Sequence, residues 1–292
     1  MMTRWIWAPL LVAAFVSAAL ADDAPRPFAS FEKAGPSDLN DPHDLAIGPD
    51  GLLYVADKFG ARIAVLDPET LEIVRVIGQG LLPQVHDISF GADGRVAVAV
   101  TGLGAVLMFD RLDGAEPTPT AALAAPRTEG ALLHSNGTVY AMSSGMGTLI
   151  AYRDGEAVGA YDGLFGAHDV AEDGDGNIWV ADNFSRRLVK FDPDLTLLQT
   201  LDHPKFGFVG PRYLDVDSFG RLVVADQDAH RVLLIDPDGS DGGSLLGVIG
   251  NGVPGKGPNQ FDDPEGVAVD GSNFYFADSD NNRIVRYRIV VN

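Results

Sequence analysis

Residues 45–68 read LAIGPDGLLYVADKFGARIAVLDP, and this stretch decides the fold. Apolar residues fill short runs, and the turn-forming residues Pro-Asp-Gly lie between two of them at positions 49–51. Short β-favouring runs bounded by Gly, Asp and Pro are typical of antiparallel strands joined by tight turns. The stretch therefore predicts part of a small antiparallel sheet, in which Asp57 and Arg62 flank one connection.

The same pattern returns along the whole chain. Strong copies keep both the Asp and the Arg: Val170–Asp182 with Arg187, Leu214–Asp226 with Arg231, and Val267–Asp278 with Arg283. Weaker copies keep the apolar alternation and lose the Asp and Arg: Ile88–Val100 and Ala131–Ser143. Six copies of about 40 to 50 residues, each with four strand-like runs, predict an all-β fold, a six-bladed β-propeller of four-stranded antiparallel blades. We expect this single domain to cover residues 22–292.

The two ends of the repeat region predict how the ring closes. The sixth copy ends after its third strand, at residues 284–291, while residues 27–33 resemble an outer strand placed before the first copy. Pairing these two segments would remove two exposed sheet edges. We expect the N-terminal strand to complete the last blade.

Composition excludes several classes of function. The 292 residues include 21 Lys and Arg against 41 Asp and Glu, a formal net charge of -20, and no Cys. The missing cysteines exclude disulfides, thiolate metal ligands and a cysteine nucleophile. The negative charge argues against a nucleic-acid partner, because phosphate binding needs a basic face.

The first 21 residues have the order of a secretory signal. Arg4 supplies a positive start, residues 5–20 are apolar, and Ala19-Leu20-Ala21 provides a small-residue cleavage site. We expect residues 1–21 to be removed and the mature protein to be periplasmic or secreted. No later segment is long and apolar enough to predict a membrane span.

Some motifs have simple structural explanations. Residues 250–255 satisfy G-x-G-x-x-G, but Pro254 and Pro258 prevent the helix that a dinucleotide site needs. Residues 173–177 resemble the start of a calcium loop and lack its later glycine and glutamate, so a hairpin turn is predicted. The Asp and Arg of each strong copy are predicted to form ion pairs that brace the blade.

One set of polar residues indicates a functional site. The position immediately before the innermost strand of each blade is occupied by a polar residue in all six copies: His43, His86, Glu129, His168, Arg212 and Glu265. In a propeller this position opens onto the central channel, so we expect the six side chains to converge around the axis. Three of the six histidines fall there, and each is followed by Asp.

These residue types are suited to metal-assisted chemistry. The imidazoles of His43, His86 and His168 are candidate ligands of a Zn²⁺ ion that keeps a fourth position for water or substrate. Neighbouring carboxylates could orient an imidazole or add a ligand. The candidate catalytic residues are Arg212, to grip a carboxylate, Tyr213, a general acid or base if its pKa is lowered, and Asp169.

The chain resembles NHL-repeat proteins. The resemblance lies in Pro264-Glu265-Gly266-Val267-Ala268-Val269-Asp270, in residues 276–284, and in the glycine-rich segment 250–261. Pro42-His43-Asp44 and its counterparts at His86 and His168 are also similar to the zinc-binding segments of peptidyl-hydroxyglycine amidating lyases. That resemblance implies a zinc-dependent lyase with a propeller fold. Here the histidines come from blades 1, 2 and 4 rather than alternate blades, and Phe59 and Phe184 stand where the lyase has a tyrosine.

The loops around the channel predict a groove. Blades 2 and 3 have small loops at 101–104 and 144–147, whereas later blades carry larger residues such as Phe184 and His230. Glu129, Phe184, His230 and Glu265 are the candidate ligand-binding residues. One hypothesis is a zinc-dependent lyase or hydrolase acting on a small substrate or a peptide end. The alternative is a non-catalytic periplasmic propeller that binds a ligand or a protein.

Overall fold

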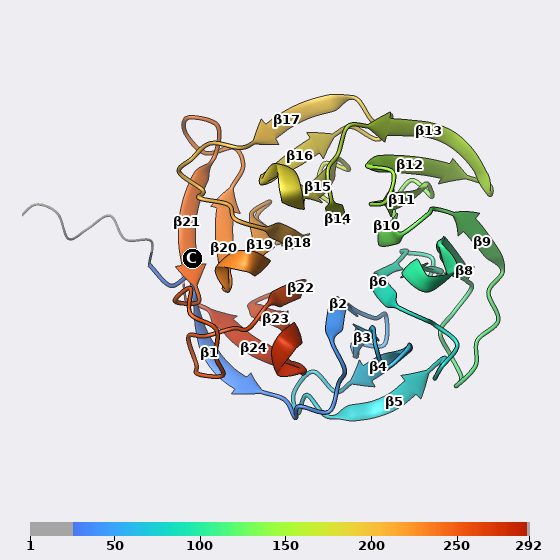
Figure 1. The fold of residues 1–292 in the computed structure, drawn as a ribbon, viewed down its shortest axis with the longest axis horizontal. Helices are drawn as coiled ribbons and strands as arrows, with labels where there is room; N and C mark the ends of the chain where they lie inside the picture. The colour runs from blue at the N-terminus through green and yellow to red at the C-terminus, as the bar shows by residue number, and fades with distance from the viewer. Residues whose placement is uncertain (1–25, 291–292) are drawn as a thin grey trace, which may run out of the picture.

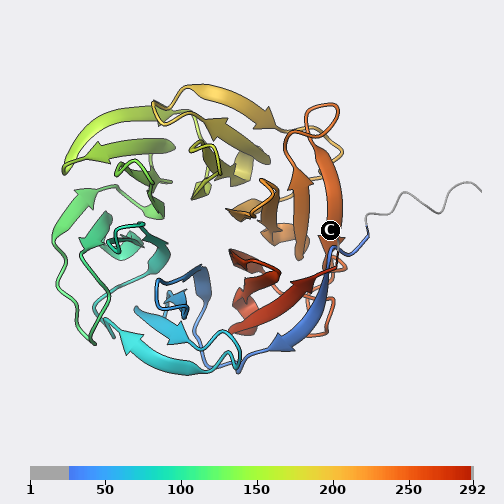
Figure 2. The ribbon, with the colours of Figure 1, turned by 180° about the vertical axis from the view of Figure 1, so that it is seen from behind.

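The computed structural model describes residues 26–290, and the predicted export signal at 1–21 lies outside them. Six four-stranded antiparallel sheets are arranged around one axis (Figures 1 and 2). This confirms the predicted all-β, six-bladed propeller. Among the described residues, no helix is long and apolar enough to cross a membrane.

The first three blades follow one another along the chain. Blade 1 consists of β2 (Pro42–Ile47), β3 (Leu53–Asp57), β4 (Arg62–Leu66) and β5 (Ile73–Ile77). Blade 2 consists of β6 (Val85–Phe90), β7 (Val96–Val100), β8 (Ala105–Phe109) and β9 (Ala121–Ala124). Blade 3 consists of β10 (Thr128–Leu133), β11 (Val139–Ser143), β12 (Thr148–Arg153) and β13 (Glu156–Asp162).

The last three blades complete the ring. Blade 4 consists of β14 (Ala167–Glu172), β15 (Ile178–Asp182), β16 (Arg187–Phe191) and β17 (Leu197–Leu201). Blade 5 consists of β18 (Pro211–Val216), β19 (Leu222–Asp226), β20 (Arg231–Asp236) and β21 (Ser244–Ile249). Blade 6 consists of β22 (Pro264–Asp270), β23 (Asn273–Asp278), β24 (Arg283–Ile289) and β1 (Ala29–Ala34). Short 3₁₀ turns follow the second strand of four blades: η1 (Thr101–Leu103), η2 (Asn183–Ser185), η3 (Gln227–Ala229) and η4 (Ser279–Asn281).

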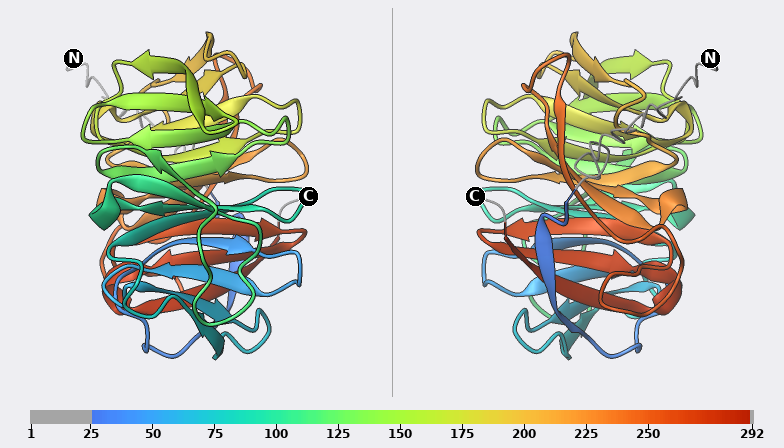
Figure 3. Two further views of the ribbon diagram at one scale, coloured as in Figure 1. Left: turned by 90° about the vertical axis from the view of Figure 1, so that its right-hand side faces the viewer. Right: turned by 90° about the vertical axis from the view of Figure 1, so that its left-hand side faces the viewer.

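Ring closure occurs as the sequence predicts. Strand β1 pairs antiparallel with β24, with Ala29 opposite Ile289 and Phe31 opposite Tyr287. The side views show β1, in blue, running beside the red strands of the last blade (Figure 3). The first and last parts of the chain therefore share one sheet, which leaves β24 paired on both sides.

The core is divided among the interfaces between blades. Each pair of neighbouring blades encloses its own cluster of buried apolar side chains. For example, Phe28 and Phe274 meet edge to face, 5.7 Å between ring centroids, in the cluster that joins blades 5 and 6. Because the second strand of every blade is almost entirely buried between its neighbours, the inner strand that pairs with it is held firmly and can position side chains at the axis.

The predicted Asp and Arg pairs form in every strong blade. The distances between Arg Nε and Asp Oδ2 are 2.6 Å for Arg62 and Asp57 and 2.7 Å for both Arg187 with Asp182 and Arg283 with Asp278. In blade 5, Arg231 Nη2 lies 2.7 Å from Asp226 Oδ2. Each aspartate is fully buried and also accepts a backbone N–H from the loop that leads into the inner strand of its blade. The pairs therefore connect two parts of one blade.

Candidate active site at the propeller axis

The predicted ring of polar residues lies at an irregularity that every inner strand shares. In each blade the pairing of the first two strands shifts register around the second residue of the inner strand. In blade 2, for example, Val85 pairs with Val100 and Asp87 pairs with Ala99, so His86 is an extra residue. A β-bulge of this kind turns its extra side chain out of the regular alternation, and bulges are common beside active sites. The bulge explains why His43, His86, Glu129, His168, Arg212 and Glu265 reach the axis.

All three histidines of the ring have the same orientation. Nδ1 lies near the backbone carbonyl oxygen two residues earlier, at 3.2 Å for His43, 2.9 Å for His86 and 2.6 Å for His168. The accepting residues Asp41, Gln84 and Gly166 have positive φ angles of 61°, 54° and 64°, which turn their carbonyls toward the imidazole. A carbonyl can only accept, so Nδ1 carries the hydrogen and Nε2 is left for other partners.

His168 and Glu129 form a close pair within the ring. His168 Nε2 contacts Glu129 Oε2, and we infer a proton between the two atoms, because an unprotonated imidazole nitrogen would repel a carboxylate oxygen at this contact. Burial would raise the pKa of Glu129, but the hydrogen bond and charge of His168 outweigh it and lower that pKa to about 2. Burial and the charge of Arg212 lower the pKa of His168, and Glu129 opposes them. Burial and Arg212 thus favour release of the proton, whereas the close contact with Glu129 keeps it on the pair.

A second pair joins His43 and Glu265 across the boundary between blades 1 and 6. His43 Nε2 lies 3.0 Å from Glu265 Oε2 and 3.1 Å from Lys58 Nζ. Burial would raise the pKa of Glu265, but the charges of His43 and Arg212 lower it to about 2. Glu265 thus remains ionised although it is only 2% exposed.

His86 differs from the other two histidines. Its Nδ1 also lies 2.7 Å from the hydroxyl oxygen of Thr101, which donates its own hydrogen to the Thr128 carbonyl. Burial and the charge of His43 lower the pKa of His86 to about 3, so its imidazole is neutral at neutral pH. Among the described residues, no hydrogen bond involves its Nε2. His86 therefore offers an unprotonated nitrogen to a ligand.

The three histidines are not gathered into one metal-sized group. The rings of His43 and His86 lie 4.5 Å apart, edge to face, while Nε2 of His168 is directed to Glu129. Within residues 26–290, no group of three or more His, Asp or Glu side chains is arranged to hold a metal ion. The shared Nδ1–H hydrogen bond to a carbonyl is nevertheless the arrangement that metal-binding imidazoles usually have.

Arg212 and Tyr213 have different surroundings, since Arg212 lines the axial cavity and Tyr213 does not. Arg212 donates from Nη1 to Gln227 Oε1 at 2.6 Å, and its Nε lies 3.5 Å from Glu265 Oε1. Tyr213 is fully buried, with its ring 6.4 Å from the rings of both His43 and His168. Burial raises the pKa of Tyr213 well above its ordinary value, with Glu265 adding to the rise. The lowered pKa on which a role as general base depends is therefore not found.

Asp169 connects two blades. Its Oδ1 accepts the N–H of Val170 at 2.6 Å, and its Oδ2 accepts the N–H of Leu214 in blade 5 at 2.7 Å. Asp87 makes the same kind of bond from blade 2 to Ala131 in blade 3, at 2.6 Å. These aspartates line a separate cavity of about 350 Å³, which Asp215 also lines. Asp169 thus lies beside the ring in sequence but borders a different space.

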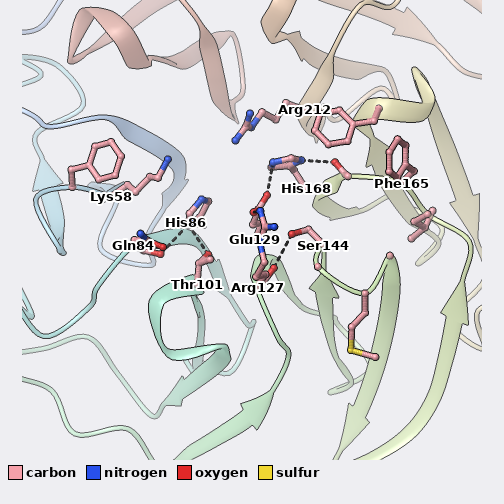
Figure 4. Close-up of a pocket in the computed structure, with 17 residues that line it drawn as sticks. Lys58, Gln84, His86, Thr101, Arg127, Glu129, Ser144, Phe165, His168 and Arg212 are labelled. Carbon is pink, nitrogen blue, oxygen red and sulfur yellow. Dashed lines mark hydrogen bonds and ion pairs between the residues drawn. The ribbon is translucent and has the colours of Figure 1, made fainter.

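A cavity of about 890 Å³ opens above the ring over blades 1 to 5 (Figure 4). Its ring residues are His86, Glu129, His168 and Arg212, and the predicted ligand-binding residue Phe184 forms part of its wall. The small loop at 144–147 also lines it, as the sequence predicts for a groove open on this side. His43, Tyr213, His230 and Glu265 do not line the cavity. The structure therefore places four of the six ring positions in one ligand-sized space.

Sequence reasoning missed Lys58, Arg127 and Phe165, which also line the cavity. Lys58 occupies a position that is polar in every blade, directly after the second strand: Lys58, Thr101, Ser144, Asn183, Gln227 and Ser279. Alignment of the repeats on that position would have found this second ring. Arg127 and Phe165 lie in the loops that lead into the inner strands, at positions where the residue type changes from blade to blade, so no recurring residue marks them.

These features define a class of protein, a six-bladed β-propeller with a polar axial site, and the chain carries an NHL repeat. The NHL repeat family matches residues 39–66. A comparison with curated proteins finds no match.

Several solved structures share the fold. Virginiamycin B lyase from Staphylococcus aureus superposes with a TM-score of 0.60 at 12% identity, covering 86% of this chain and 96% of that one. Aldose sugar dehydrogenase from Streptomyces coelicolor gives 0.63 at 14%, covering 91% and 100%. A protein of unknown function from Bacteroides thetaiotaomicron gives 0.69 at 15%, covering 90% and 75%. At these identities the likeness concerns the fold alone.

Proposed function

We propose that the protein is an enzyme, a lyase or hydrolase, that acts on a small molecule bound in the axial cavity. The proposal rests on two histidines that line the cavity and differ in protonation, His86 and His168. His86 is neutral with a free Nε2, whereas His168 shares a proton with Glu129. Groups whose surroundings give them different protonation states are what acid–base catalysis needs.

Each residue of the floor has a role in this proposal. His86 accepts a proton from the substrate or from a bound water through Nε2. The proton that His168 and Glu129 share passes to the leaving group, and a proton from water later restores the pair, whose imidazolium form the Glu129 carboxylate stabilises. Arg212 binds a negative group of the substrate or the charge that develops during the reaction.

Zinc binding is the second candidate, and the orientation of the histidines supports it. His43, His86 and His168 would hold the ion through Nε2, since all three direct Nδ1 to a carbonyl oxygen. Bound zinc would supply a Lewis acid and an acidic water. The spacing of the described side chains does not support it, because Lys58 Nζ lies 3.1 Å from the nitrogen that His43 would offer. The metal content of protein purified without a histidine tag separates the two candidates.

Export remains part of the proposal. The periplasm or the extracellular space would be the site of action, and the mature chain would begin at Asp22. Mass spectrometry of the protein expressed in a secreting bacterium gives its N-terminus. A mature chain that retains residues 1–21 would contradict export with cleavage at this site.

The enzyme proposal is tested by conversion of a panel of esters, lactones and hydroxy acids, with products measured by mass spectrometry. The wild-type protein should convert at least one class, and Glu129→Gln and His168→Gln should slow that reaction about 100-fold or more. Glu156→Gln, at an exposed position on β13, is the matched control and should behave as wild type. Equal rates in all variants, or no conversion by the wild type, would favour the non-catalytic binding propeller instead.

A further inference from the structure

We infer that the ligand of the axial cavity is a small organic acid that carries a flat apolar group. This inference rests on the proposed function for the location of the site, and it concerns the chemical class of the ligand. The observation behind it is that the cavity is basic and partly aromatic, whereas the protein as a whole is acidic.

The cavity is basic in an acidic protein. The whole chain has 41 acidic against 21 basic residues, yet the charged residues of the cavity are Lys58, Arg127 and Arg212 against the single acid Glu129. In the view of Figure 4, Glu129 lies between Arg212 and Arg127. A carboxylate would find guanidinium groups on two sides of this floor.

Two of these cations have hydrogen-bond donors that are available to a ligand. Arg127 makes only a loose ion pair with Glu129, at 3.7 Å, and 73% of its side chain is exposed. Arg212 Nε lies 3.5 Å from Glu265 Oε1 and Nη1 donates to Gln227, while among the described residues no hydrogen bond involves Nη2. Lys58 differs, since its Nζ lies 3.0 Å from Asp41 Oδ2 and also contacts His43. The acid group of the ligand is therefore expected at the two arginines.

The wall of the cavity is apolar and exposed. Phe165 and Phe184 are 65% and 60% exposed and meet edge to face with ring centroids 5.3 Å apart. Met146, at 60% exposed, and Phe59, at 58%, also line the space. Large exposed apolar side chains grouped at the mouth of a cavity mark a binding surface. A flat apolar group fits this surface, because an aromatic pair offers both ring faces and edges.

Calorimetry with three simple compounds tests the inference. The compounds are 3-phenylpropionate, its uncharged amide, and propionate, titrated into the full chain. We expect the aromatic acid to bind about tenfold or more tightly than either of the other two. Arg127→Gln should remove the preference for acid over amide, and Phe184→Ala should remove the preference for phenylpropionate over propionate.

Two exposed residues away from the cavity provide matched controls. Arg111→Gln, at a side chain 78% exposed, and Phe219→Ala, at a residue 77% exposed, should leave both preferences unchanged. Equal binding of acid and amide, both weakened by Phe184→Ala, would overturn the assignment of an acid while leaving a ligand site in the cavity. Binding that neither Arg127→Gln nor Phe184→Ala alters, or no binding of any compound, would overturn the inference as a whole. The enzyme proposal is judged separately by the Glu129→Gln comparison.

Discussion

At the scale of single residues, Tyr213 shows how burial decides between a catalytic role and a space-filling role. The sequence places it beside Arg212 and makes it a candidate acid or base. In the structure its hydroxyl is buried without a hydrogen-bond partner, and its pKa lies well above the ordinary value. A buried hydroxyl without a partner costs stability, and this one does not line the cavity. We therefore expect Tyr213 to fill space at the axis.

Replacing Tyr213 by Phe tests this expectation. The free energy of unfolding should stay unchanged or rise by about 1 kcal/mol, since the change removes an unpaired polar group. Tyr140→Phe is the control, because the Tyr140 hydroxyl donates to the Pro193 carbonyl at 2.6 Å and its loss should cost about 1 kcal/mol. Urea unfolding measures both. Loss of turnover in Tyr213→Phe at unchanged stability would restore Tyr213 as a catalytic residue.

The sequence predicted the six ring residues because the repeat fixes their position in every blade. It did not predict which ring residues pair. His168 meets Glu129 in the blade before it, and His43 meets Glu265 in the blade before it, across the closure of the ring. Such contacts depend on how neighbouring blades pack together, and the spacing of one copy contains no information about that. Arg127 was missed because its position, two residues before the ring residue, recurs in the blades while its residue type does not: Asp41, Gln84 and Gly166 stand there in other blades.

At the scale of elements, the inner strands are connected by carboxylates. Asp215 in β18 accepts the N–H of Val216 at 2.7 Å and the N–H of Val269 in β22 at 2.8 Å, which joins blades 5 and 6. Burial raises the pKa of Asp215 from 3.8 to about 6, although two backbone amides favour the ionised form. Folding is therefore linked to the protonation of this carboxyl group.

The sign of this linkage gives a prediction for Asp215→Asn. The pKa is higher in the folded than in the unfolded protein, so the contribution of Asp215 to stability is complete below pH 3.8 and is lost as the pH rises through 6. The difference corresponds to about 3 kcal/mol, which partial exposure reduces to about 1–2 kcal/mol. The unfolding free energy at pH 7 minus that at pH 4 should be more positive by that amount in Asp215→Asn than in the wild type, because the variant lacks this loss of stability. Asp194→Asn, on an exposed turn, should leave the pH dependence unaltered, and equal pH dependence in all three proteins would contradict the account.

At the scale of the whole molecule, the ring is closed by the first strand of the chain. The sequence predicted this closure because the last copy lacks its outer strand and a matching segment precedes the first copy. Phe28, just before β1, is fully buried among residues of blades 5 and 6. The N-terminal segment therefore contributes to the core as well as to the sheet.

Phe28→Ala tests how much the closure of the ring by the N-terminal segment contributes to the free energy of unfolding. It should lower the free energy of unfolding by about 3–5 kcal/mol, through lost burial and the cavity that remains. Phe219→Ala, at an exposed ring on a turn of blade 5, should change it by less than about 0.5 kcal/mol. Thermal unfolding monitored by circular dichroism compares the two. Similar small effects for both would mean that the N-terminal segment does not secure the ring.

The central claim is that the axis holds an acid–base site in which His168 and Glu129 share a proton. Nitrogen and proton nuclear magnetic resonance of histidine-labelled protein tests it most directly. The account predicts a hydrogen on Nδ1 of His168 and a second hydrogen shared between its Nε2 and Glu129 Oε2 at neutral pH, with the shared proton shifted to low field. That signal should disappear in Glu129→Gln and persist in Glu156→Gln. A neutral His168 with an unprotonated Nε2, unaffected by Glu129→Gln, would contradict the claim.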